Sequence, residues 1–148
     1  MTQYSESYCL AILITSLKKR KRYPDPITVA ECAQFLYKMY GSFEQVSQMV
    51  DAHPSVIRKW VNLATAPEYL RQCVKENKIY PVAAFAILAA FKENSKIQEI
   101  AKEVSGWGEP EIVRFIKFMK EHPELPVLEC KNRFMSEVIG RLVDGNNE

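Results

Sequence analysis

The 148-residue sequence has only two histidines and no paired cysteines, although these residues build most protein metal sites. Neither His53 nor His122 has a cysteine at ligand spacing. The four cysteines stand far apart, at positions 9, 32, 73 and 130, and no C-x-x-C motif occurs. Each cysteine lies in an apolar helical pattern, which favours a reduced, buried thiol. We therefore expect no zinc site and no cofactor.

Long apolar segments are also missing. The apolar stretch CLAILI at residues 9–14 is far shorter than the roughly 20 residues that span a bilayer. A basic run follows this stretch, whereas a secretory signal carries its basic residues in front. These features predict a cytoplasmic protein with no membrane partner, whose first helix is buried against other helices.

Motifs of catalysis are lacking as well. The sequence contains no phosphate-binding loop of the GxxxxGK[ST] type. We find no carboxylate pair, no metal cluster and no nucleophile with a base from which to assemble a reaction. The sequence therefore predicts a protein that is not an enzyme.

Strand patterns are almost absent, while signals for helix starts recur along the chain. Hydrophobic residues make up 47% and charged residues 26%, a balance typical of a globular protein with its own core. Four helices are expected to begin where Ser or Thr is followed three residues later by Glu or Gln, at Thr28, Ser42, Thr65 and Ser95. The apolar segment 82–91 should form a central helix that is buried nearly all round. We predict one all-α domain over residues 1–148, with about eight helices and a C-terminal helical extension over 109–148.

The segment SFEQVSQMVDAHPSVIRKWVNL, residues 42–63, has the pattern of a helix-turn-helix. Val46 is the apolar anchor of its first helix, and Ser47 is the small residue where the second helix crosses. Asp51 occupies the turn position that requires a positive φ, which Asp tolerates better than most residues. Ile57 and Trp60, three residues apart on the second helix, are predicted to face the core.

The opposite face of the second helix is polar and basic. With Ile57 and Trp60 inward, helix geometry turns a polar set outward, namely His53, Ser55, Arg58, Lys59 and Asn62. Arg bonds guanine bidentately and Asn does the same with adenine, while Ser and a helix N-terminus suit a phosphate. No acidic residue occurs from position 54 to 67. These residues predict DNA binding in the major groove, but two helices with a polar outer face also occur in any helical bundle.

Positive charge is concentrated in the N-terminal half, although the net charge of the chain is only +2. Residues 1–75 carry ten Lys and Arg against six Asp and Glu, whereas residues 76–148 carry ten against twelve. A basic face attracts polyanions such as DNA, and an ordinary solvated surface is the alternative. A basic run ends the first helix, and it either contacts the DNA backbone or only caps that helix: Lys18, Lys19, Arg20, Lys21 and Arg22.

Three consecutive segments are similar to those of a known family. They are ITVAECAQFLYKMYG (27–41), the helix-turn-helix itself, and APEYLRQCVKENKIYPVAAFAIL (66–88). Together, residues 27–91 resemble the central helix-turn-helix domain of the ParB family of plasmid and chromosome partition proteins, which includes KorB-type repressors. In that family a Pro-Glu helix leads into a V-x-x-G-K-I-S turn and an alanine-rich helix. The resemblance implies double-stranded DNA as the partner, and the family's DNA-reading positions fall on the five outward residues named above.

Several positions depart from the family pattern. Asn77 replaces the usual Gly, and Asn also tolerates a positive φ. Tyr80 and Pro81 stand where the family tends to have Ser and a small residue, and AAF at 83–85 replaces Gly-His-Ala. Only 26 residues precede Ile27 and they contain no Gly, so a CTP switch of the family type is not expected.

The two helices expected near 110–121 and 126–143 are rich in apolar residues. These residues either pair across a homodimer, the usual way for such domains to read a palindrome, or complete the core of the monomer. We thus predict a sequence-specific DNA-binding protein, either a transcriptional regulator or a partition accessory associated with the nucleoid or a plasmid. The alternative is a protein–protein interaction adaptor that uses the same fold without binding DNA.

Overall fold

The computed structural model describes residues 4–18 and 25–146, and this part of the chain contains helices and no strand, which confirms the all-α prediction. None of the described helices combines the length and apolarity needed to cross a bilayer. The nine helices of the described ranges are α1 (Glu6–Lys18), α2 (Pro26–Tyr40), α3 (Phe43–Val50), α4 (Pro54–Ala64), α5 (Glu68–Lys75), α6 (Pro81–Ala90), α7 (Asn94–Val104), α8 (Glu109–Glu121) and α9 (Val127–Asn146).

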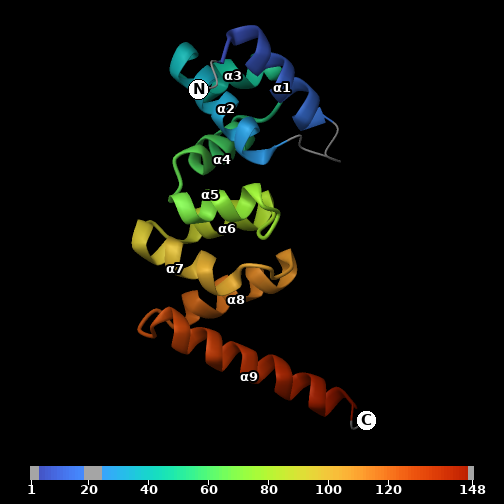
Figure 1. The fold of residues 1–148 in the computed structure, drawn as a ribbon, viewed down its shortest axis with the longest axis vertical. Helices are drawn as coiled ribbons and strands as arrows, with labels where there is room; N and C mark the ends of the chain where they lie inside the picture. Colours follow the sequence, from blue (N-terminus) through green and yellow to red (C-terminus); the bar gives the residue numbers. More distant parts are fainter. Residues whose placement is uncertain (1–3, 19–24, 147–148) are drawn as a thin grey trace.

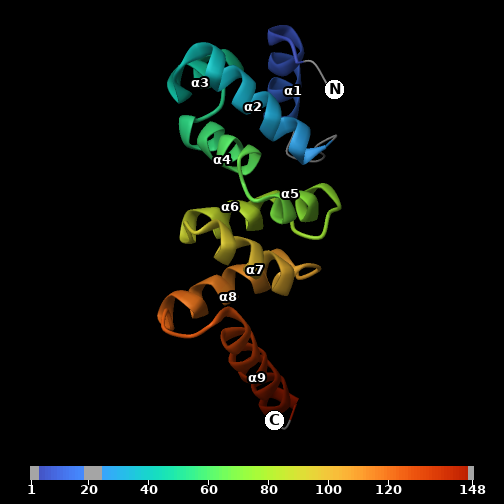
Figure 2. The same ribbon diagram turned by 60° about the vertical axis from the view of Figure 1, so that its left-hand side comes forward.

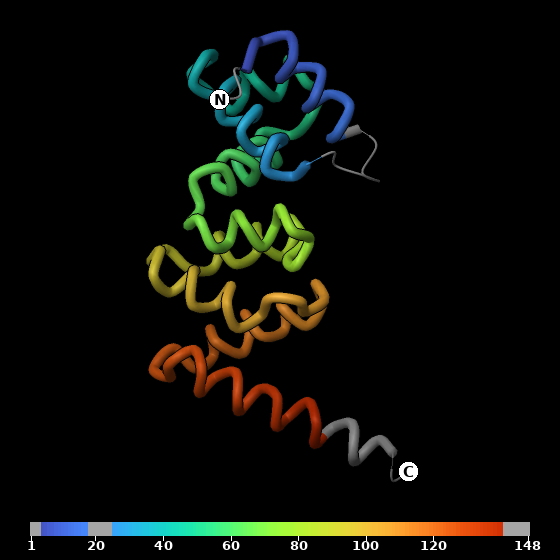
Figure 3. The backbone as a smooth tube through the Cα atoms, viewed as in Figure 1, coloured from blue at the N-terminus to red at the C-terminus, as the bar shows by residue number. Residues whose placement is uncertain are grey.

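The helices are stacked along one long axis (Figure 1). α1, α2, α3 and α4 form one end, where α2 packs against both α1 and α4. The pairs α5/α6 and α7/α8 follow as successive layers, with α5 on α7 and α6 on α8 (Figure 2). α9 packs against α7 and α8 at the far end of the stack (Figure 3). One cluster of buried apolar side chains includes members from each of these nine helices.

α6 differs from its sequence-based expectation. Pro81, Ala83, Ala84 and Ile87 are buried, but Val82 remains 53% exposed. The prediction of a helix buried nearly all round is therefore wrong. The physical reason is the layered stack, in which α6 is covered by α8 on one side and by α4 on another, so that the remaining apolar surface faces outward.

The expected capping box of Thr28 and Glu31 is also wrong. α2 begins three residues earlier than this box would place it, because Asp25 is its N-cap and Pro26 its first residue. The Asp25 carboxylate accepts hydrogen bonds from the Ile27 N–H at 3.0 Å and from the Thr28 hydroxyl at 3.2 Å. Asp followed by Pro is a stronger start signal than a later Thr, because Asp caps well and Pro suits the first helical position.

Two of the other expected helix starts are corrected as well. The Thr65 hydroxyl donates to the Asn62 carbonyl at 3.3 Å, so Thr65 closes α4 instead of opening α5. Ser95 lies inside the first turn of α7, which has no side-chain cap. Ser42 is confirmed as a cap, because its hydroxyl accepts from the Gln45 N–H at 3.1 Å.

Two tyrosine–carboxylate hydrogen bonds and a buried thiol pair fasten α1 to α2. The Tyr4 hydroxyl donates to Glu31 at 2.9 Å, and the Tyr40 hydroxyl donates to Glu6. Cys9 and Cys32 are fully buried, and burial raises the pKa of both thiols, so both are protonated at neutral pH. All four cysteines are buried and form no disulfide, and their burial was expected from the sequence.

We predict that Asp25→Ala lowers the free energy of unfolding by about 1 kcal/mol, because it removes the α2 cap. Urea denaturation measures the change. Ser95→Ala is the matched control, and it should change stability by less than about 0.5 kcal/mol because Ser95 caps nothing. Equal losses in the two variants would contradict the observed start of α2.

Candidate nucleic-acid interface

α3 and α4 are two short helices joined by a turn, in the segment where the helix-turn-helix was predicted. Asp51 ends α3 with φ 57° and ψ 52°, the left-handed conformation expected at the turn. Ser47 and Ala52 lock the turn together, because the Ala52 N–H donates to the Ser47 carbonyl at 3.3 Å and the Ser47 hydroxyl donates to the Ala52 carbonyl. A larger residue at position 47 would separate these groups. The turn therefore fixes the angle at which α4 leaves α3.

The inner face of α4 is apolar and fully packed. Ile57 and Leu63 have no exposed surface, and Trp60 is 2% exposed. The Trp60 ring meets Phe85 of α6 edge-on, with centroids 5.0 Å apart. The inward orientation of Ile57 and Trp60, predicted from their spacing, is confirmed.

The outer face of α4 carries the predicted polar set. All five residues of this set are exposed. Four of them belong to α4, and helix geometry places these four on one face about 100° wide: Ser55, Arg58, Lys59 and Asn62. Neither Arg58 nor Lys59 forms an ion pair with another described residue. Both cations are therefore available to an anionic ligand without an internal salt bridge being broken.

His53 is the N-cap of α4. Its Nδ1 accepts a hydrogen bond from the Ser55 N–H at 3.1 Å and lies 2.8 Å from the Ser55 hydroxyl oxygen. In the tautomer whose Nδ1 accepts this bond, the ring N–H is on Nε2. The exposed ring thus presents an N–H donor beside the start of α4.

Arg58 also contacts an aromatic side chain. Its guanidinium carbon lies 5.6 Å from the centroid of the Phe43 ring, which begins α3. Phe43 is not among the site residues predicted from the sequence. Its spacing of three and seven residues from Val46 and Val50 places it on the apolar face of α3, but no sequence signal links it to Arg58.

The basic run that was predicted to contact the DNA backbone lies mostly outside the described residues. Lys19, Arg20, Lys21 and Arg22 are not among the residues that the structure describes. Lys18 ends α1, but its side chain is not described. Among the residues that the structure describes, the candidate interface consists of α4 and its cap.

An open groove of about 670 Å³ borders this face, between α4 and α6. His53 and Lys59 belong both to its lining and to the outer polar set, and Asp51 adds one acidic group. The remaining lining is apolar or aromatic: Leu17, Ala52, Val56, Trp60, Val82, Phe85, Ala86 and Ala89. No pattern in the sequence predicts this groove.

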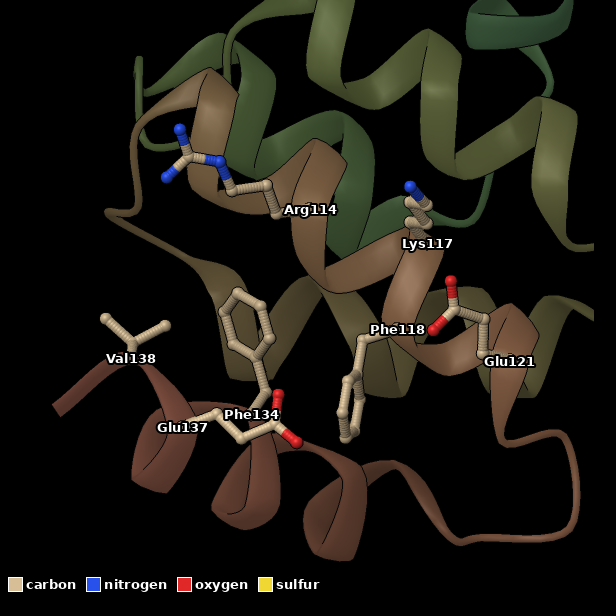
Figure 4. Close-up of a pocket in the computed structure, with 7 residues that line it drawn as sticks. All are labelled: Arg114, Lys117, Phe118, Glu121, Phe134, Glu137 and Val138. Atoms are coloured by element: carbon tan, nitrogen blue, oxygen red, sulfur yellow. The ribbon is translucent and has the colours of Figure 1, made fainter. Parts of the chain in front are cut away.

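A second groove, of about 500 Å³, separates α8 from the middle of α9 (Figure 4). Phe118 and Phe134 line it, with Arg114, Lys117 and other charged side chains around them.

Most apolar residues of α8 and the first half of α9 are buried and complete the core of the chain. Among the side chains of α8 and α9 that the structure describes, four large apolar ones are exposed, namely Val113, Leu128, Met135 and Ile139. Monomer packing thus uses most, but not all, of the apolar surface that a dimer was expected to share.

The segment after α4 has the backbone expected at Asn77. This residue has φ 62°, and the Lys78 N–H donates to the Cys73 carbonyl at 2.8 Å to close the α5 turn. A positive φ at Asn77 was expected from the sequence, because Asn tolerates this conformation.

Comparisons with protein-family models, curated proteins and solved structures find no match for the chain.

We predict that the Asp51 backbone, and not its carboxylate, is what the turn requires. Asp51→Gly should leave the free energy of unfolding unchanged or raise it, because Gly adopts a positive φ at no steric cost. Asp51→Val should lower it by about 1–2 kcal/mol, because a β-branched residue resists this conformation. Urea denaturation of both variants measures the difference, and equal destabilisation by Gly and Val would contradict the assigned turn.

Proposed function

We propose that this chain is a sequence-specific DNA-binding protein that inserts α4 into the major groove. The observation that supports this proposal is the exposed ridge of Ser55, Arg58, Lys59 and Asn62 on α4, opposite the buried Ile57 and Trp60. An 11-residue helix is about 16 Å long, and the major groove, about 12 Å wide, accepts an α-helix. No acidic side chain interrupts the ridge.

Each part of the ridge has chemistry that suits the duplex. Arg58 and Asn62 have the donor and acceptor groups that read base edges. Lys59 and the N–H of the His53 ring suit phosphates on either side. The resemblance to ParB-type proteins agrees with this use of α4, and it favours a regulator or a partition accessory.

The direct experiment selects fragments from a genomic library with the purified protein and maps the bound sites by footprinting. Affinity is then measured across a series of salt concentrations. DNA binding through phosphates predicts a linear fall of log affinity with log salt. An absence of DNA affinity even at low salt would refute the proposal.

We predict that Arg58→Ala weakens binding to the selected site by about 1–3 kcal/mol, because it removes a base contact. Lys120→Ala is the matched control: it also removes an exposed cation, but on α8, far along the stack from α4. This control should bind like the wild type in a fluorescence anisotropy titration. Wild-type affinity for Arg58→Ala would refute the assignment of the recognition face.

Lys59→Ala should behave differently from Arg58→Ala, because a lysine acts on phosphate as a point charge. We expect a similar loss of affinity for selected and unrelated duplexes. The slope of log affinity against log salt should decrease in magnitude by about 1. If affinity fell only for the selected site, Lys59 would contact a base and not a phosphate.

The groove between α4 and α6 favours one second candidate, a protein–protein interaction adaptor. Grooves with apolar floors accept the apolar face of a partner helix. In this case Val82, which is exposed at the groove, would be the sensitive position, and the protein would have no affinity for DNA. Val82→Asp should then abolish partner binding, whereas the Arg58→Ala variant should retain it.

A further inference from the structure

The guanidinium of Arg58 lies over the ring of Phe43. Its neighbour Lys59 has no such contact with any ring in the described part of the chain. The 5.6 Å between the Arg58 guanidinium carbon and the Phe43 ring centroid is within the range of a cation–π contact. The Phe43 ring is held in turn by Tyr37 of α2, with centroids 4.2 Å apart and ring planes at 54°. Phe43 of α3 therefore contacts both Tyr37 of α2 and Arg58 of α4.

This support matters because arginine is a long side chain with many rotamers. An exposed Arg that binds a base must give up much of this freedom on binding, and a partner that already restrains it reduces that loss. Phe43 is itself half-buried, and its ring contacts Tyr37 of α2. Phe43 therefore restricts where the Arg58 guanidinium can lie in the unbound protein.

The chemistry of the guanidinium then selects the ligand. Its five N–H donors lie in the plane of the group and point away from the central carbon, which lies over the Phe43 ring. Guanine presents two acceptors, O6 and N7, side by side in the major groove, and they match a pair of guanidinium donors. A lysine ammonium has no such fork and cannot make the same distinction.

We propose that Phe43 is a positioning residue that holds Arg58 for bidentate recognition of one guanine. This inference rests on the proposed function, because it assigns a base to the same face of α4. It adds that specificity for guanine depends on a residue of α3 that does not itself contact the base. Lys59 then supplies charge without base preference.

The first test uses the free protein. The Nε–Hε resonance of Arg58, assigned by its loss in Arg58→Lys, should show a ring-current shift in the wild type and in Phe43→Tyr. The shift should disappear in Phe43→Leu, which keeps an apolar side chain without a ring. An Arg58 resonance that is the same in the wild type and Phe43→Leu would overturn the proposal whether or not DNA binds.

The second test measures affinity for the selected site and for variants in which each G·C pair is replaced by A·T. Phe43→Leu should weaken the selected site about 2–5-fold and reduce discrimination at one G·C pair. The salt slope should not change, and Phe43→Tyr should restore the preference. In an Arg58→Lys background, Phe43→Leu should have no further effect on affinity.

Different outcomes separate this inference from the proposed function. If Phe43→Leu weakens all duplexes equally, or still weakens binding in the Arg58→Lys background, Phe43 is only structural and the inference falls, while DNA binding stands. Thermal unfolding of both Phe43 variants shows whether such a loss follows from stability. If the wild type binds no duplex at low salt, the proposed function itself falls.

Discussion

Burial of the inner face of α4 is the constraint on which the rest of the structure depends. Ile57, Trp60 and Leu63 are held between α2 and α6, so α4 cannot rotate about its axis without exposing a large apolar surface. The same contacts join the first four helices to the layers below, because Trp60 packs on Phe85 of α6. A helix fixed in this way presents its opposite face as a rigid surface.

That surface consists of two adjoining parts with different chemistry. The basic ridge on α4 suits a polyanion, and the groove between α4 and α6 suits an apolar side chain or helix. His53 and Lys59 belong to both parts, so a ligand on one part would contact residues that the other part also uses. The two candidate functions therefore share residues, but they differ in dependence on salt, because only phosphate binding releases counterions.

Local signals in the sequence were reliable where the backbone itself imposed the requirement. Asp51 and Asn77 have the positive φ that was expected at their positions, because few residue types tolerate that conformation. Helix starts were less reliable. Thr65 has a capping side chain but closes the preceding helix, since a hydroxyl can bond to either helix end. Where several residues near a boundary can cap, spacing alone does not choose between them.

The sequence by itself determined the helical class, the position of the turn at Asp51 and the side of α4 that faces outward. Each follows from helical periodicity or from steric limits on one residue, which act over a few positions. Only the tertiary structure decided that Phe43 lies beneath Arg58, that α6 leaves Val82 exposed, and which apolar residues of α9 remain uncovered. These features depend on how helices distant in sequence cross and cover one another, and no local pattern specifies such crossings.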